Sequence, residues 1–187
     1  MIFTTEASGV LTYVGPEWEA LTGQDRHAAL GEGWLACLDS EDGAILRGAL
    51  AEAARTRAEF TVRFRLRRVG GVSIWAVAGA VPSYGPPDTT FLGFLGSITE
   101  IAPTVGESLA ARASIGRFVP PPQQPSTLPG SALDLVADHL LIAHSLIEAD
   151  GGKSALPALR EALFRIGQEI ARKEFGQSGH ADADRIH

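Results

Sequence analysis

Cysteine and histidine are the residue types in this chain best suited to nucleophilic or metal chemistry, and both are sparse. The single cysteine, Cys37, lies in an apolar run. Because reactive thiols need an electropositive setting, the run predicts a small buried hydrophobic role for it. No Cys/His cluster has the spacing of a zinc site. The motifs include neither a glycine-rich phosphate loop nor a nucleophile and base arrangement, so we predict a non-enzymatic protein that binds no metal.

Composition limits the function classes further. The 187 residues carry 16 basic and 22 acidic side chains and a formal net charge of -6. Nucleic-acid binding is therefore not expected, because it needs a basic face. One cysteine allows no internal disulfide, which is typical of a reducing compartment. The chain starts without signal-peptide features, and no apolar stretch reaches the length of a membrane span. We therefore expect a cytoplasmic protein that does not cross a membrane.

The N-terminal half alternates strand-like and helical signals. Two short β-rich runs at its start predict a hairpin, and broken helix follows from Glu17 through Trp34. Ser40 is a suitable N-cap for a longer helix over 41–56. Three further strands are predicted, at 60–67, 72–81 and 90–101, with a loop at 85–88 between the last two.

The strand predicted at 60–67 has the cleanest pattern in the chain. Its apolar residues Phe60, Val62, Phe64 and Leu66 alternate with Thr61, Arg63, Arg65 and Arg67. Period-two alternation places the apolar side chains on one face and the arginines on the other. We expect the arginine face to point away from the core, either solvated or covered by segment 105–118, by a partner or by a second copy.

Three motifs occur in a characteristic order. The first, Gly9–Gly23 (GVLTYVGPEWEALTG), resembles a strand that runs into a short helix. The second joins Gly33-Trp34-Leu35 to the acidic turn Asp39–Asp42, and the third is Phe91–Ile101 (FLGFLGSITEI). Together they resemble a PAS domain over residues 1–101. The resemblance implies an α+β fold, with a five-stranded antiparallel sheet carrying short helices on one face, and a role in sensing small ligands or mediating protein contacts.

The resemblance also bears on cofactors. Flavin-binding photosensory relatives carry a reactive cysteine where Trp34 stands here, and a glutamine in the last strand where Ile98 stands here. Haem-binding relatives usually ligate iron through a histidine on the long helix, and segment 40–56 contains none. We therefore predict that the purified protein holds neither flavin nor haem and is colourless.

Several apolar side chains are predicted to point between the sheet and its helices. These ligand-pocket candidates are Trp34, Leu46, Leu50, Phe60, Val62, Phe64 and Ile98. They could surround a pocket for a small apolar ligand or fill their own core, and apolar patterning alone does not separate the two.

The C-terminal part follows a proline-rich segment, 119–130, which predicts a semi-rigid linker. Helices are expected at 132–149 and 154–175, and the short connection between them predicts an antiparallel hairpin. Each helix carries a heptad-like apolar seam. The candidate dimer-interface residues are Leu133, Val136, Leu140, Ile147, Leu156, Leu159, Leu163, Ile166 and Ile170. The predicted organisation is a PAS-like domain at 1–102, a connector at 103–130, a hairpin at 131–176 and a flexible tail at 177–187.

A two-helix hairpin leaves apolar surface uncovered, and Leu135, Ile142 and Leu146 form a second apolar row. Docking on the PAS-like domain would cover it, as would a second copy; we favour a homodimeric four-helix bundle because the linker holds the hairpin away. The predicted function is a bacterial-type sensor or adaptor that contacts another signalling protein. The hairpin also resembles the phosphoacceptor bundle of histidine kinases, although the usual flanking motif is absent. Phosphotransfer through His139 or His144 is therefore the alternative.

Overall fold

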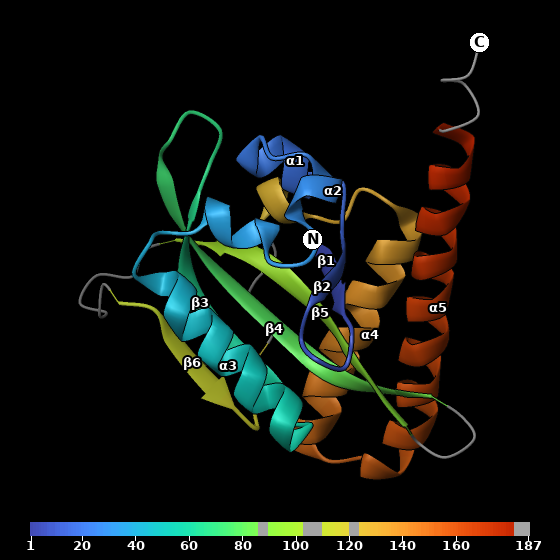
Figure 1. The fold of residues 1–187 in the computed structure, drawn as a ribbon. Coiled ribbons are helices and arrows are strands. Elements are labelled where there is room, and N and C mark those ends of the chain that lie inside the picture. The colour runs from blue at the N-terminus through green and yellow to red at the C-terminus, as the bar shows by residue number, and fades with distance from the viewer. Residues whose placement is uncertain (86–89, 103–109, 120–123, 182–187) are drawn as a thin grey trace.

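The computed structural model describes residues 1–85, 90–102, 110–119 and 124–181, with side chains through Lys173 (Figure 1). An antiparallel sheet lies at the centre, with the short helices and α3 on one face and two long C-terminal helices on the other (Figure 1). Its strand order is β2-β1-β5-β4-β3-β6. The predicted α+β antiparallel architecture is confirmed, with one strand more than the five expected.

The elements follow the predicted order along the chain. The strands are β1 (Ile2–Thr5), β2 (Leu11–Val14), β3 (Phe60–Arg67), β4 (Ser73–Gly85), β5 (Thr90–Ile101) and β6 (Arg112–Ile115). The α-helices are α1 (Glu17–Thr22), α2 (Arg26–Ala29), α3 (Asp42–Thr56), α4 (Ala132–Asp150) and α5 (Leu156–Ala181). Three 3-10 turns complete the set, η1 (Gly33–Cys37), η2 (Pro125–Thr127) and η3 (Lys153–Ala155).

Some predicted boundaries differ from the structure. Helix α3 begins at Asp42, and Ser40 does not cap it; Glu41 holds the N-cap position without a side-chain bond. Helix α5 continues past Phe175 and Gly176 to Ala181, because a glycine weakens a helix without necessarily ending it. Residues 86–88 of the predicted loop, 103–109 and 120–123 of the predicted connector, and 182–187 of the predicted tail lie outside the described residues.

The sixth strand lies within the predicted connector. Strand β6 pairs antiparallel with the first half of β3, from Phe60 opposite Ile115 to Arg63 opposite Arg112. Its four residues are too few to show a period, so only pairing with β3 makes this segment a strand. The described part of segment 105–118 therefore extends the sheet edge, and its end reaches the outer face: the Arg117 carbonyl accepts from the Thr61 hydroxyl at 3.0 Å, and Phe118 packs in the apolar cluster there.

The inner face of the sheet carries the alternation predicted for residues 60–67. Phe60, Val62, Phe64 and Leu66 are all buried against α3, where Leu46 and Ala53 face them. The Phe60 ring meets the Phe94 ring edge-on, with centroids 5.2 Å apart. Small residues on β4 complete this layer, namely Ala76, Ala78 and Ala80.

The C-terminal hairpin packs on the outer face of the same sheet (Figure 1). One buried apolar cluster joins the sheet to the hairpin. The sheet contributes Ile2, Tyr13, Val81 and Leu95, the hairpin contributes Ala137, Leu141, Leu163 and Ile170, and Phe118, which follows β6, completes the cluster. The prediction that a linker holds the hairpin away is wrong for the described chain. The physical reason is that the outer sheet face is apolar at β1, β4 and β5, so the hairpin covers it and buries both surfaces.

The proline-rich segment is anchored where the structure describes it. Thr127 is buried, and its hydroxyl accepts a hydrogen bond from the backbone nitrogen of Glu100 at 3.3 Å. The backbone nitrogen of Met1 donates to the carbonyls of Ile98, at 3.1 Å, and Thr127. Residues 124–130 therefore tie α4 to the end of β5, which a free spacer would not do.

Candidate functional site

An apolar cavity of about 40 Å³ lies between the inner sheet face and the helices. The structure brings all seven predicted pocket residues to its walls: Trp34, Leu46, Leu50, Phe60, Val62, Phe64 and Ile98. Seven further wall residues were missed: Phe3, Thr5, Gly9, Leu11, Val14, Trp18 and Ala78. The sequence of β1 and β2 gave no periodic signal for Phe3 or Leu11: an irregularity in their pairing puts Leu11 and Tyr13, two residues apart, in clusters on opposite faces. The small residues Gly9 and Ala78 give no such signal either.

Among the described residues that line the cavity, the polar side-chain groups of Thr5 and Trp18 already have hydrogen-bond partners. The Thr5 hydroxyl donates to the carbonyl of Glu6 at 3.0 Å and accepts from the backbone nitrogen of Phe94 at 3.1 Å. The indole nitrogen of Trp18 donates to Gln24 at 3.0 Å. Typical ligand pockets enclose roughly 300–1,000 Å³. The site as it stands therefore suits a very small apolar molecule, and anything larger requires its walls to move.

Gln24 ties together the two helical segments over the cavity. Its side-chain oxygen accepts from Trp18 on α1 and from the Cys37 thiol, at 3.0 and 3.3 Å. Its side-chain nitrogen donates to the carbonyl of Gly33 at 2.9 Å, at the start of the turn that carries Trp34. Burial raises the pKa of the Cys37 thiol, which keeps it protonated as a donor. Cys37 is half-buried and packs against the core, so it stabilises this arrangement.

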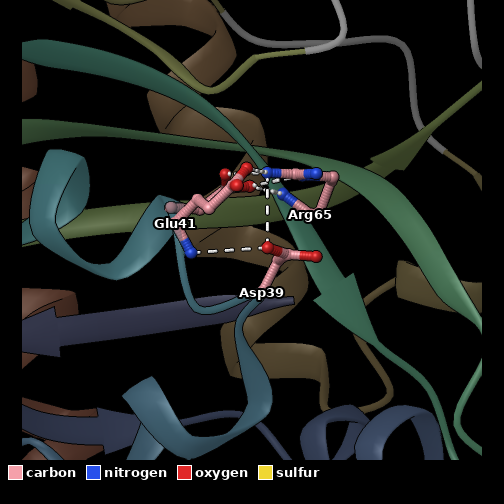
Figure 2. Close-up of polar contacts among 4 residues, drawn as sticks. Asp39, Glu41 and Arg65 are labelled. Atoms are coloured by element: carbon pink, nitrogen blue, oxygen red, sulfur yellow. Dashed lines mark hydrogen bonds and ion pairs between the residues drawn. The ribbon is translucent and has the colours of Figure 1, made fainter.

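Arg65 connects β3 to the start of α3 on the other side of the cavity. Figure 2 shows its guanidinium between Asp39 and Glu41. The carboxylate of Asp42, which is 1% exposed, accepts from the Arg65 guanidinium at 2.7 Å and from its backbone nitrogen at 2.6 Å. Burial alone would raise the pKa of Asp42, but the hydrogen bonds from Arg65 outweigh it and lower that pKa.

The predicted arginine face is thus only partly an outer face. Strand β6 stops pairing at Arg63, so the next part of the β3 edge is open to the Leu38–Asp42 segment. Arg65 turns toward that segment, and Arg67 donates to the carbonyl of Ala36. Arg63 remains on the outer face, where its guanidinium lies 4.5 Å from the centroid of the Trp75 ring.

Buried ionisable groups occupy the interface between the outer face and the hairpin. The Tyr13 hydroxyl on β2 donates to the Asp134 carboxylate on α4, at 2.9 and 3.1 Å. Asp134 is 1% exposed, and burial raises its pKa although the Tyr13 bond acts in the opposite direction. Ten residues further along α4, almost three turns, His144 is also buried.

The predicted interface residues divide between the two helices. On α5, Leu156, Leu163 and Ile170 are buried, and Leu159 and Ile166 pack beside them. On α4, Leu133, Leu140 and Ile147 are half-buried, and Val136 is 44% exposed. The residues that α4 buries are instead Asp134, Ala137, Asp138, Leu141 and His144. The predicted α4 seam is therefore only partly docked: Leu133 and Leu140 pack against the buried cluster, whereas Val136 is exposed. Acidic side chains face inward beside them because partners such as Tyr13 hydrogen-bond to them.

Residues 11–90 match the family model described as the PAS fold. This region is similar to PAS domains, which agrees with the resemblance carried by the motifs between Gly9 and Ile101. Among the described residues, none of the helices has the length and apolar character to cross a bilayer, and no group of three or more His, Cys, Asp or Glu side chains is placed to hold a metal ion.

Individual relatives cover different parts of the chain. Uncharacterized protein y4lL of Sinorhizobium fredii is 33% identical over 118 residues, which make up 62% of this chain and 14% of that protein. The chain thus spans a small part of that relative. The PAS domain of a Colwellia psychrerythraea protein is 22% identical, with a TM-score of 0.44, covering 54% of this chain and 84% of that one. The Rhodobacter sphaeroides LOV protein is 17% identical, with a TM-score of 0.47, covering 92% of this chain and 90% of that one.

Proposed function

We propose that the chain is a non-enzymatic cytoplasmic sensor whose PAS domain responds to a small apolar molecule and signals through its C-terminal hairpin to another protein. One observation carries this proposal: the cavity and the hairpin lie on opposite faces of the same two strands. Ala78 and Ile98 border the cavity, while Val81 and Leu95 of those strands contact the hairpin. A ligand that moves β4 or β5 would therefore change the surface on which the hairpin rests.

The size of the cavity supports a colourless sensor. A volume of about 40 Å³ leaves no room for a flavin or a haem. Trp34 and Ile98, which replace the side chains of flavin-binding relatives, both lie on the cavity wall. The expected absorption spectrum of purified protein has no visible band, and stoichiometric flavin or haem would contradict the proposal.

Xenon and benzene are suitable probes of this site because both enter apolar protein cavities. In amide-resolved NMR of the full chain, we expect xenon or benzene to shift residues around the cavity and, more weakly, residues of α4 and α5. Ala78→Val should abolish these shifts by filling the cavity. Val77→Ile, the control on the opposite sheet face, should leave them in place. Absence of xenon and benzene binding to the wild type would count against the sensing site, and binding without any hairpin shift would count against signalling through the sheet.

The outer side of α4 supports a homodimer through exposed apolar residues, of which only Val136 belongs to the predicted interface set. Leu135, Val136 and Leu146 are 38%, 44% and 57% exposed. The only acidic residues of α4 before Glu148, Asp134 and Asp138, both point inward. By contrast, α5 exposes ion pairs such as Arg165 with Glu161. A second copy is the partner we propose for the α4 row, because two uncharged apolar rows meet without leaving a charge unpaired.

The oligomer proposal has a direct test. We expect wild type to sediment as a dimer and Leu146→Asp to sediment as a folded monomer, because the new charge would be buried in the contact. Arg165→Asp places the same carboxylate on the solvated side of α5 and should remain a dimer. A monomeric wild type would contradict the proposal.

Phosphotransfer is the second candidate, and the exposure of His139 on α4 is the observation that favours it. His144 is 1% exposed and hydrogen-bonded to Arg160, so it is closed to a phosphodonor in this conformation. Incubation with a phosphorylated response regulator or a cognate kinase should label the wild type and not His139→Gln if this function holds. An unlabelled wild type would exclude it for that donor.

A further inference from the structure

His144, which is 1% exposed, is a buried titratable side chain where the hairpin meets the PAS domain. Its Nε2 lies 3.3 Å from Nε of Arg160 on α5, and its Nδ1 lies 3.9 Å from a carboxylate oxygen of Glu59, just before β3. Arg160 also reaches Glu148, one turn along α4, at 3.1 Å, and Lys153 approaches that glutamate at 3.8 Å. The cluster therefore joins both helices of the hairpin to the start of β3.

The hydrogen bond from Arg160 defines the charge state of the ring. A guanidinium N–H only donates, so His144 Nε2 must accept, and the ring is neutral with its proton on Nδ1. That Nδ1 has no hydrogen-bond partner among the described residues, and Glu59 is the acidic group that faces it. A second ring proton would have to occupy the position that Arg160 now uses.

We propose that His144, buried in its neutral form, acts as an acid-sensitive latch that holds the hairpin on the sheet. Uptake of one solvent proton at Nε2 removes the acceptor of the Arg160 hydrogen bond and leaves two cations 3.3 Å apart at the present geometry. Because both residues belong to the hairpin, undocking does not separate them; it lets water hydrate the charged ring, which is 1% exposed in the docked state. Undocking exposes the outer sheet face and the inner side of the hairpin to a partner.

The direction of the pH response follows from the surroundings of the ring. Burial, and then the charge of Arg160, lower the pKa of His144 from its usual value of 6.5, and the opposing effect of Glu148 is smaller. A histidine whose pKa is lower in the docked state favours docking above its free pKa, and that contribution is lost as the pH falls below about 6.5. Burial raises the pKa of Glu59, so its own protonation favours the docked state and opposes the effect of His144, although it also removes the counter-charge nearest to the ring.

Distance measurements between the two parts would test the latch in the full chain. Spin labels at Arg47→Cys on α3 and Arg165→Cys on α5, in a Cys37→Ser background, report docking by pulsed electron resonance. We expect a single distance population at pH 8 and a second, longer one at pH 5. The docked-to-undocked ratio should fall by up to about tenfold per pH unit, the limit for uptake of one proton.

Two substitutions isolate the responsible histidine. His144→Gln keeps an acceptor for Arg160 and does not titrate. The distances between the two spin labels in this variant should therefore be independent of pH. His139→Gln removes an exposed histidine of the same helix and should retain the parent response. A pH-independent parent, or a response retained in His144→Gln, would overturn the latch.

A measurement without substitution at position 144 covers the case in which His144→Gln fails to fold. The ring nitrogen shifts of His144 in the parent should titrate with the same midpoint as undocking. Distinct midpoints would also overturn the proposal.

Discussion

The two faces of the sheet use different means to hold their helices. The inner face packs α3 through apolar side chains around a small cavity, and its buried ion pair, Asp42 with Arg65, lies at the margin of that core. The outer face packs the hairpin through an apolar cluster in which Asp134 and His144 are also buried. Apolar contacts do not depend on pH, whereas buried ionisable groups do. The inner layer is thus suited to enclosing a ligand, and the outer layer to a contact that changes with conditions.

The largest expected effect tests whether the outer layer is part of the folded unit. Leu163→Asp places a charge in the buried cluster beneath the hairpin, where an unpaired charge is destabilising by several kcal/mol, about 3 or more. We expect the α4 and α5 amides to lose hydrogen-exchange protection while β3 and α3 keep theirs. Arg165→Asp, on the solvated side of α5, is the control with the same new carboxylate and should keep wild-type protection. Unchanged protection in Leu163→Asp would show that this contact does not hold the hairpin.

The next largest effect is expected from removing the ion pair between Arg65 and Asp42 at the edge of the inner layer. Arg65→Ala leaves Asp42 buried without its partner, and we expect a loss of about 3 kcal/mol in the free energy of unfolding at pH 7. Because the pKa of Asp42 is lowered, this contribution exists above its unfolded value near 3.9 and is lost as the pH falls through the lower folded value. The difference in free energy of unfolding between wild type and Arg65→Ala, measured by urea titration, should therefore decrease below about pH 4. Arg63→Ala, on the other sheet face, should show no such decrease.

A smaller effect measures the polar part of the outer layer. Tyr13→Phe removes the hydroxyl that donates to Asp134, and a buried carboxylate without that bond should reduce stability by about 1–3 kcal/mol. Burial raises the pKa of Asp134, so the native state takes up its proton more readily than the unfolded chain, and the deficit should shrink as the pH falls toward 4. A deficit that grows on acidification would contradict this account of the interface.

The smallest effect concerns the cavity. Ala78→Val adds two carbons to a void of about 40 Å³ and supplies a residue that suits a strand. We expect a stability change within about 1 kcal/mol in either direction, because filling and overpacking oppose each other. Calorimetry would measure it, and a loss well above 1 kcal/mol would mean that the void is not large enough for the added methyl groups.

What the sequence determined by itself was local. The alternation from Phe60 to Leu66 identified the inner face. The motifs from Gly9 to Ile101 indicated a PAS-like domain, and the family model described as the PAS fold matches residues 11–90. The seven predicted pocket residues followed, because periodicity and family order together state which side chains share a face. The sequence did not predict whether these side chains would leave a void between them, because a void depends on how well their shapes fit together.

Only the tertiary structure decided what each face meets. Strand β6 is a strand because β3 offers an open edge, and Arg65 turns toward Asp42 because β6 stops at Arg63. The rotation of α4 depends on Tyr13 and Asp134, which are 121 positions apart in the chain. A helix that buries two aspartates and a histidine contradicts its own apolar periodicity, and it is stable only because residues brought together by folding supply the hydrogen bonds that water would otherwise provide.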